Sequence, residues 1–149
     1  MDPYTAATFH NASILAHSVL HGIEKNYEKN NELSDVDLIQ LYHIYGDISE
    51  KALTILENSS IVRFVTEDKT VKIYQVEGSS GIQYLIYPNY NYCACSAYKY
   101  HVCKIESLYL TCKHILAAKL AEITQQFKDE TISHTGAVEL LMSSFITNT

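Results

Sequence analysis

The chain has 149 residues, of which 47% are hydrophobic, and it carries a net charge of −6. This composition is typical of a globular protein with one core, or one core and a small satellite, and it excludes a disordered tail. The sequence has no basic leader followed by an apolar stretch and no run near the eighteen or so apolar residues that a membrane span needs, so we expect a soluble, intracellular protein.

The first sixty residues favour helices. Apolar residues recur at steps of three and four from Ala16 to Tyr27, the spacing of one helix face. A second helix is expected after Ser34, a residue type that caps helix starts, and Gly46 is suited to end it before a third helix begins. We therefore predict a helical region over residues 1–60, which holds nine acidic and three basic residues.

The pattern changes at Ile61 to β-branched and aromatic residues. Three runs follow, separated by short polar segments: IVRFVT, VKIYQV and IQYLIY. Runs of this kind are typical of strands, and the short connections indicate an antiparallel meander of three strands. The last run continues toward Cys93, so we expect the sheet to deliver the first of the metal ligands described below.

A helix is expected directly after His114, with a stripe formed by Leu116, Leu120, Ile123 and Phe127 that can cover the sheet. A last short helix is expected over about residues 137–145. The predicted fold class is α+β, with N-terminal helices, a three-stranded antiparallel meander leading into the cysteine-containing segment that starts at residue 93, and C-terminal helices. Residues 61–149 would form one compact unit with the helical region.

Two pairs of metal-ligating residue types carry the chemistry of the sequence. Cys93-Ala-Cys95 is followed after sixteen residues by Cys112-Lys-His114. Three thiolates and one imidazole complete a tetrahedral zinc site. Residues i and i+2 of an extended strand point to the same side, so the first pair can reach one ion from a strand end, and the second pair can reach it from the start of a helix. The alternative is that Cys93, Cys95 and Cys112 are small buried apolar residues and that His114 is an ordinary histidine at a helix start.

Four protein ligands leave the zinc ion no open coordination position, so it could not activate water. We therefore expect one structural zinc ion and no enzyme activity. A catalytic zinc would require that one of the four residues does not bind and that water replaces it. The turn Gly78-Ser-Ser-Gly81 lacks the ending of a phosphate-binding loop, so no nucleotide is expected to bind there.

Two further residues could replace a ligand. Cys103 is the fourth cysteine, which is either a packed free thiol or a substitute ligand, and His101 is a weaker competitor. In a reducing compartment disulfides are not expected, so the cysteines either bind metal or remain free thiols.

Tyrosines and lysines are interleaved around the cysteines. Eight of the twelve tyrosines lie between residues 74 and 109. They could stack on the bases of single-stranded DNA or serve in the sheet and in a protein interface. The candidates for direct DNA binding are Lys99, Lys104, Lys113, Tyr98 and Tyr100. So few cations predict weak binding by the chain alone, because non-specific affinity grows with the number of phosphates neutralised.

The order Cys-x-Cys, variable loop, Cys-x-His resembles the SWIM-type zinc finger, including the alanine three residues after the histidine, Ala117. Over about residues 73–123 the chain also resembles the small SWIM-domain proteins that serve as Shu-complex subunits in homologous recombination. The carrying segments are IYQVEGSSGIQYLIYPNYNYCACSAYKY and LTCKHILAAKLAEI. The resemblance implies that the two pairs hold one zinc ion and that Ala117 is the small residue where the helix packs close to the finger.

The resemblance also implies a function. Such proteins pair with a RecA-like recombinase paralogue and promote the assembly of recombinase filaments on single-stranded DNA. We therefore expect a nuclear, non-catalytic adaptor that meets DNA through its complex, as part of a heterodimer or a larger assembly. A single-stranded DNA-binding zinc module is the alternative.

Overall fold

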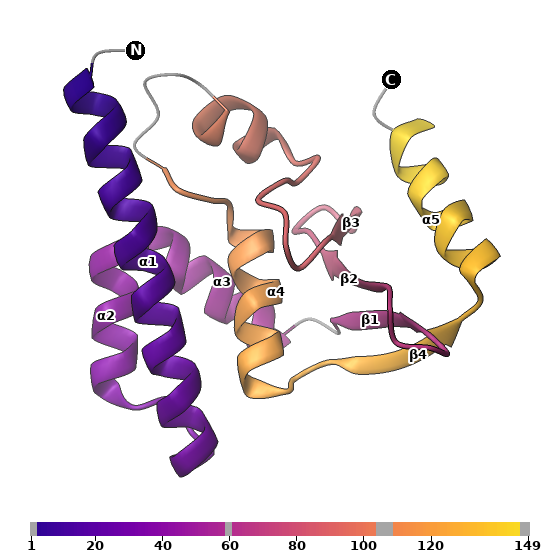
Figure 1. Ribbon diagram of the computed structural model, residues 1–149, viewed down its shortest axis with the longest axis horizontal. Helices are drawn as coiled ribbons and strands as arrows, with labels where there is room; N and C mark the ends of the chain where they lie inside the picture. The colour runs from indigo at the N-terminus through magenta and orange to yellow at the C-terminus, as the bar shows by residue number, and fades with distance from the viewer. Residues whose placement is uncertain (1–2, 59–60, 104–108, 147–149) are drawn as a thin grey trace.

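The computed structural model describes residues 3–58, 61–103 and 109–146. Figure 1 shows α1, α2 and α3 on one side, α4 near the middle, and the sheet and α5 on the other side. The elements in chain order are α1 Pro3–Asn30, α2 Asp35–Tyr45, α3 Asp47–Asn58, β1 Val62–Thr66, β2 Lys72–Glu77, β3 Gln83–Ile86, the short π-helix η1 Tyr98–Val102, α4 Lys113–Thr124, β4 Lys128–Ile132 and α5 His134–Ile146.

The start of α2 is fixed by a reciprocal cap. The Asp37 N–H donates to Ser34 Oγ at 3.1 Å, and the Ser34 N–H donates to the Asp37 carboxylate at 2.9 Å. The Asn26 amide of α1 donates to the other carboxylate oxygen at 3.1 Å, so the cap also ties α2 to α1. Asp37 is fully buried, which opposes its ionisation, but these hydrogen bonds outweigh burial and hold its pKa below the usual value.

The end of α2 also agrees with the sequence. Gly46 takes a positive φ of 60° after the last helical residue and its N–H donates to the Tyr42 carbonyl at 2.7 Å. Glycine adopts this conformation without the penalty that a Cβ brings. The predicted helical character of the N-terminal region is thus confirmed, whereas the division into regions 1–60 and 61–149 stays a prediction.

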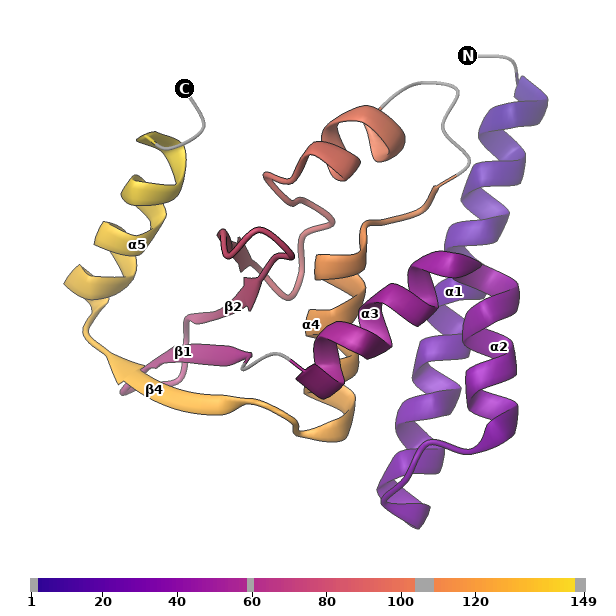
Figure 2. The same cartoon turned by 180° about the vertical axis from the view of Figure 1, so that it is seen from behind.

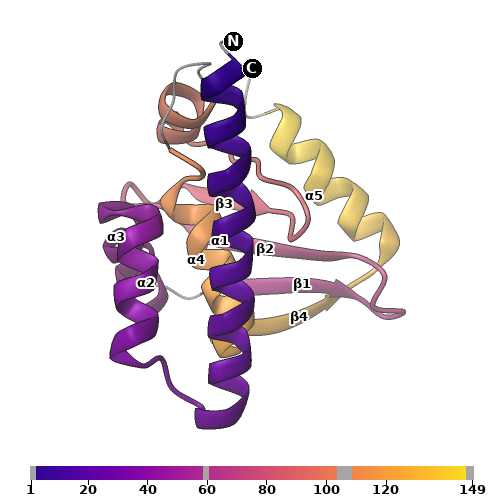
Figure 3. The same ribbon diagram turned by 60° about the vertical axis from the view of Figure 1, so that its left-hand side comes forward.

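The sheet has four strands in the order β3-β2-β1-β4, and it is mixed. β1 and β2 pair antiparallel, as do β2 and β3, but β4 pairs parallel to β1, with Val62 opposite Lys128. The prediction of three antiparallel strands was therefore wrong. Figure 3 shows β2, β1 and β4 side by side with α5 beyond them. β4 was missed because its sequence, KDETI, is charged and mostly exposed, so it lacks the apolar pattern of a strand.

A bidentate ion pair and a ring cluster hold β4 in place. Arg63 of β1 donates to both carboxylate oxygens of Asp129, at 2.6 and 2.7 Å. The Arg63 guanidinium also lies 4.1 Å above the ring of Phe127, which meets Tyr74 edge-on at 5.8 Å. Phe127 was expected in the stripe of α4, but the helix ends at Thr124 and Gln125 turns left-handed with φ 57°. The Phe127 ring therefore packs from the connection to β4.

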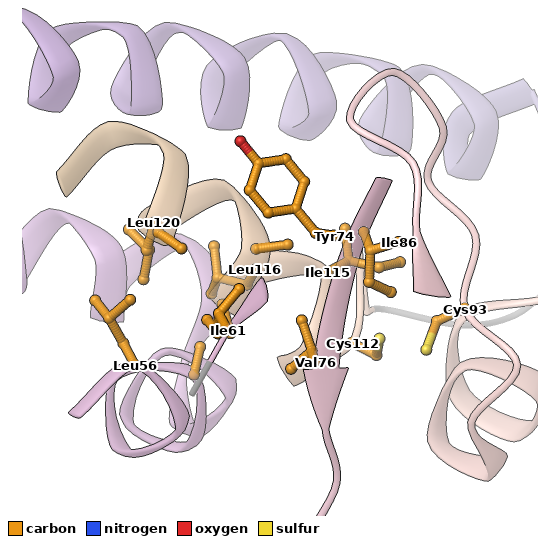
Figure 4. Close-up of a cluster of buried hydrophobic side chains, with 14 of the residues drawn as sticks. Leu56, Ile61, Tyr74, Val76, Ile86, Cys93, Cys112, Ile115, Leu116 and Leu120 are labelled. Carbon is orange, nitrogen blue, oxygen red and sulfur yellow. The ribbon is translucent and has the colours of Figure 1, made fainter. Parts of the chain in front are cut away.

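The core lies between α4, α3 and the sheet. α4 packs against α3, α1, β2 and β3, and it is apolar on nearly every side. Figure 4 shows Ile115, Leu116 and Leu120 of α4 close to Tyr74, Val76 and Ile86 of the strands and to Leu56 of α3. Such an all-round apolar helix is typical of a central position. In the described part of the chain, no helix combines the length and the apolar character that crossing a bilayer requires.

Candidate metal centre

Two segments far apart in the sequence supply the candidate ligands. Cys93 and Cys95 lie in irregular chain between β3 and η1. β3 itself ends at Ile86, so these cysteines do not lie at the strand end where the sequence analysis placed them. Cys112 is the N-cap of α4, with extended φ and ψ of −103° and 167°, and His114 lies in the first turn. The second pair thus sits at a helix start, as predicted.

The four side chains converge. The ligand atoms of Cys93, Cys95, Cys112 and His114 all lie within 4.8 Å of one another, and each residue is at most 3% exposed. His114 Nδ1 lies 3.8 Å from Cys93 Sγ and 4.0 Å from Cys112 Sγ. Figure 4 shows the sulfur atoms of Cys93 and Cys112 meeting between α4 and the segment after β3.

This geometry fits a zinc ion. Zinc–sulfur bonds of about 2.3 Å in a tetrahedron place neighbouring ligand atoms about 3.8 Å apart, close to the separations seen here. All three cysteines of the group are free thiols. The set of three soft sulfurs and one imidazole is the donor set that zinc prefers, so this buried group could hold one zinc ion.

The thiols also influence one another's ionisation. Hydrogen bonds from Cys112 and Cys93 lower the pKa of Cys95, and the same contacts with Cys112 and Cys95 raise the pKa of Cys93. The Tyr98 N–H adds a hydrogen bond to Cys95 Sγ at 3.3 Å, which favours a thiolate there. Metal ligands must be deprotonated, so a metal ion entering this cluster displaces the protons that the remaining thiols hold.

The imidazole of His114 is oriented by packing. Its Nδ1 faces the sulfurs, whereas its Nε2 is buried and, within the described residues, has no hydrogen-bond partner. The ring of Tyr84 lies against it, with 4.4 Å between ring centroids. A Cβ added at Gly78 would come within 2.7 Å of the Tyr84 ring and 3.4 Å of His114 Nε2. Gly78 therefore lets the β2–β3 turn close over the metal-facing histidine.

Asn91 joins the two ligand segments. Its amide donates to the Leu110 carbonyl at 2.9 Å, and its side-chain oxygen accepts from the Thr111 hydroxyl at 2.9 Å. Its carbonyl accepts from the Tyr98 hydroxyl. These bonds link the chain before Cys93 to the chain before Cys112. Sequence reasoning missed Asn91, Gly78 and Tyr84, because nothing in their residue types or spacing distinguishes them from ordinary turn and strand residues.

The residues predicted to bind DNA do not form one cluster among the described residues. Lys99 is exposed and its ammonium lies 5.6 Å from the ring centre of Tyr100, whereas Lys113 is half-buried at the start of α4. Tyr98 is half-buried, and its hydroxyl bonds to Asn91. Lys104 lies outside the described residues.

Three remaining residues were named from the sequence. Cys103 is exposed at the end of η1, and His101 is exposed with its ring 5.6 Å from that of Tyr109. Neither residue belongs to the converging group of four. Ala117 is fully buried on α4, one turn after the histidine of the group.

Comparisons with known proteins identify similar chains. The zinc finger SWIM domain-containing protein 7 homolog of Dictyostelium discoideum is 31% identical over 101 residues, which are 67% of this chain and 64% of that protein, less than two thirds of its length. Zinc finger SWIM domain-containing protein 7 of Mus musculus is 29% identical over 110 residues, which are 74% of this chain and 71% of that protein. Zinc finger SWIM domain-containing protein 7 of Danio rerio is 27% identical over 125 residues, which are 80% of this chain and 88% of that protein.

No family model and no solved structure matches the chain. The resemblance to SWIM-type zinc finger proteins, inferred from the spacing of cysteines and histidine, is confirmed by the names of these relatives. The converging group of four residues agrees with it.

Proposed function

We propose that this relative of SWIM zinc finger proteins is a non-catalytic, zinc-stabilised adaptor subunit of a Shu-type complex. In this role it would pair with a RecA-like recombinase paralogue in the nucleus and support recombinase filament assembly in DNA repair by homologous recombination. The observation that carries the proposal is the closed, buried group of four soft ligands in a chain similar to SWIM domain-containing protein 7.

The ligand set supports a structural role for the metal. Bound zinc would cross-link the two ligand segments with an apparent binding free energy of roughly 10–16 kcal/mol. This is comparable to the unfolding free energy of a whole domain, roughly 5–15 kcal/mol. Cys93 and Cys95 would fix the irregular chain after β3, and Cys112 and His114 would fix the start of α4. With four protein ligands buried around one position, no site is left for a substrate or a reactive water, which supports a non-enzymatic protein.

The surface around the ligands supports an interaction role. Four tyrosines of the segments next to the cysteines are 43–70% exposed: Tyr90, Tyr92, Tyr100 and Tyr109. Tyrosine is enriched at protein interfaces, where its ring buries a large area and its hydroxyl still finds partners. A metal cross-link that holds these segments in one conformation lowers the entropy cost of docking them on a partner.

Co-expression with a RecA-like paralogue tests the adaptor role. The wild-type chain should co-purify with the paralogue in a one-to-one complex, with the stoichiometry measured by light scattering after gel filtration. The complex should contain about one zinc ion. Cys112→Ser should abolish the complex, whereas the matched control Cys103→Ser should retain it because Cys103 lies outside the group. A wild-type chain that stays alone at micromolar concentrations would contradict the proposal.

Direct binding of single-stranded DNA is the second candidate, favoured by the exposed Lys99 beside Tyr100. If Lys99, Lys104 and Lys113 contact phosphates, log K against log salt should have a slope no steeper than about −2. Fluorescence anisotropy on the isolated chain measures this. Tight binding that a triple alanine variant of these lysines loses would place DNA binding ahead of the adaptor role.

A further inference from the structure

α2 has an unusual distribution of apolar residues. Seven of its eleven residues, DVDLIQLYHIY, are apolar, yet only one side of the helix is covered. Leu41 and Tyr45 are buried, together with Asp37, toward the neighbouring helices. Figures 1 and 2 show α2 at the outer edge of the molecule, away from the sheet. Asp35, Gln40 and His43 are also exposed on α2, so its uncovered side is a mixed surface in which the apolar residues are the unusual part.

The uncovered side carries an ordered row of side chains. Val36 is 60% exposed, Ile39 is 57% exposed and Tyr42 is 55% exposed. Single exposed apolar residues are ordinary on protein surfaces. These three follow one another at three-residue steps, however, and so form one continuous ridge along the helix, with Leu38 at its flank. We call Val36, Ile39 and Tyr42 the α2 ridge. Ridges at this spacing pack into the grooves of a second helix.

The charges around the ridge select the partner. The sequence from Asn31 to Asp47 contains four acidic residues and no lysine or arginine. Asp37 is buried and Asp47 is paired with Lys51 at 3.5 Å, but Glu32 and Asp35 are exposed around the start of α2. A second copy of this chain would bring acidic groups against acidic groups, which opposes association. A helix with basic residues beside its apolar stripe would be attracted instead.

We propose that the α2 ridge is a docking surface for an amphipathic helix of another protein, whose apolar stripe is flanked by lysine or arginine. α2 holds no candidate metal ligand, so this surface is separate from the metal centre and goes beyond the proposed adaptor role of the finger. It gives the chain a second place of contact, on the acidic helical region rather than on the zinc-binding segment.

Two synthetic helical peptides test this surface on the full-length, zinc-loaded protein. They share one leucine stripe, and its flanks are lysines in one peptide and glutamates in the other. Fluorescence anisotropy should show at least about tenfold tighter binding of the lysine peptide, with a preference that shrinks as salt rises. Amide chemical-shift changes in NMR spectra should concentrate on residues 35–45.

Variants locate the binding. Val36→Ala/Ile39→Ala/Tyr42→Ala should weaken the lysine peptide by about tenfold or more, because the lost apolar contacts carry the affinity. The matched control is Val138→Ala/Met142→Ala on α5, where the residues are 56% and 57% exposed. The control should bind as the wild type does. Alanine favours helix, so unchanged circular dichroism and zinc content would show that both variants fold.

Three outcomes would overturn the proposal. The first is equal affinity for the two peptides, and the second is chemical-shift changes that lie outside α2. The third is a dimer in sedimentation equilibrium that Ile39→Asp dissociates, since the occupant of the α2 ridge would then be a second copy of the chain.

Discussion

Residues 35–58 and residues 87–114 span similar lengths of chain but differ in what holds them. The first segment is almost entirely helix, and its buried residues, such as Leu41 and Ala52, face neighbouring helices. In the second, the described residues 87–103 and 109–114 contain little regular structure besides η1 and the start of α4, and their most buried side chains are the candidate metal ligands. Packing and capping can hold the first segment without a metal, whereas the second needs a cross-link in place of a core.

Removing zinc should separate the two segments most clearly. A strong chelator, or Cys112→Ser, should remove roughly 10–16 kcal/mol of apparent binding energy and unfold the chain from about residue 90 to the start of α4. Amide hydrogen exchange should then become fast there while residues 35–45 of α2 stay protected. The control Cys103→Ser should exchange as the wild type does. Protection that survives chelation throughout would show that the second segment has a core of its own.

Leu41→Ala should have the next largest effect, in the opposite segment. Leu41 is fully buried, so its truncation leaves a cavity and should cost about 2–5 kcal/mol of unfolding free energy in urea denaturation. Zinc affinity, measured by competition with a chromophoric chelator, should stay unchanged. A matched loss of zinc affinity would mean that the two segments fold as one unit and that the comparison fails.

The buried Asp37 gives the helical segment a pH dependence. Asp37→Asn replaces one accepting carboxylate oxygen with an NH2 group, so either the Ser34 N–H or the Asn26 amide loses its acceptor. The variant should therefore lose about 1–3 kcal/mol of unfolding free energy at neutral pH. The folded pKa of Asp37 lies below its usual value, so its carboxylate contributes stability above the unfolded pKa. This contribution is lost as pH falls through the folded pKa. The difference between variant and wild type in urea midpoints should therefore shrink in acid, and a difference that grows would contradict the assignment.

Gly78→Ala should produce the smallest effect, confined to the metal centre. The added methyl group would press on the Tyr84 ring and through it on the imidazole of His114, which should weaken zinc binding about tenfold. Gly22, whose Cβ would meet nothing within 4 Å, is the matched control. Gly22→Ala should leave zinc affinity unchanged and stabilise α1 by up to about 1 kcal/mol. Equal zinc affinity in all three proteins would exclude a positioning role for Gly78.

The same contrast explains which features the sequence could predict. The helices follow from local periodicity and from the cap at Ser34, and the converging group follows from rare donor types at short spacing. β4 could not be found this way, because its charged residues pair with β1 through the backbone and through Arg63. The roles of Asn91 and Gly78 could not be predicted from the sequence for a related reason, since these roles arise only when separate segments of the chain come into contact.

The parallel pairing of β4 with β1 has a consequence for biosynthesis. Lys128 is made 66 residues after its strand partner Val62, so a ribosome delivers the whole finger and α4 in the interval. Until then one edge of β1 offers unpaired peptide groups, the kind of template on which nascent chains aggregate. The sheet should therefore be completed late in synthesis, and nascent chains that stall before β4 should be the ones that aggregate.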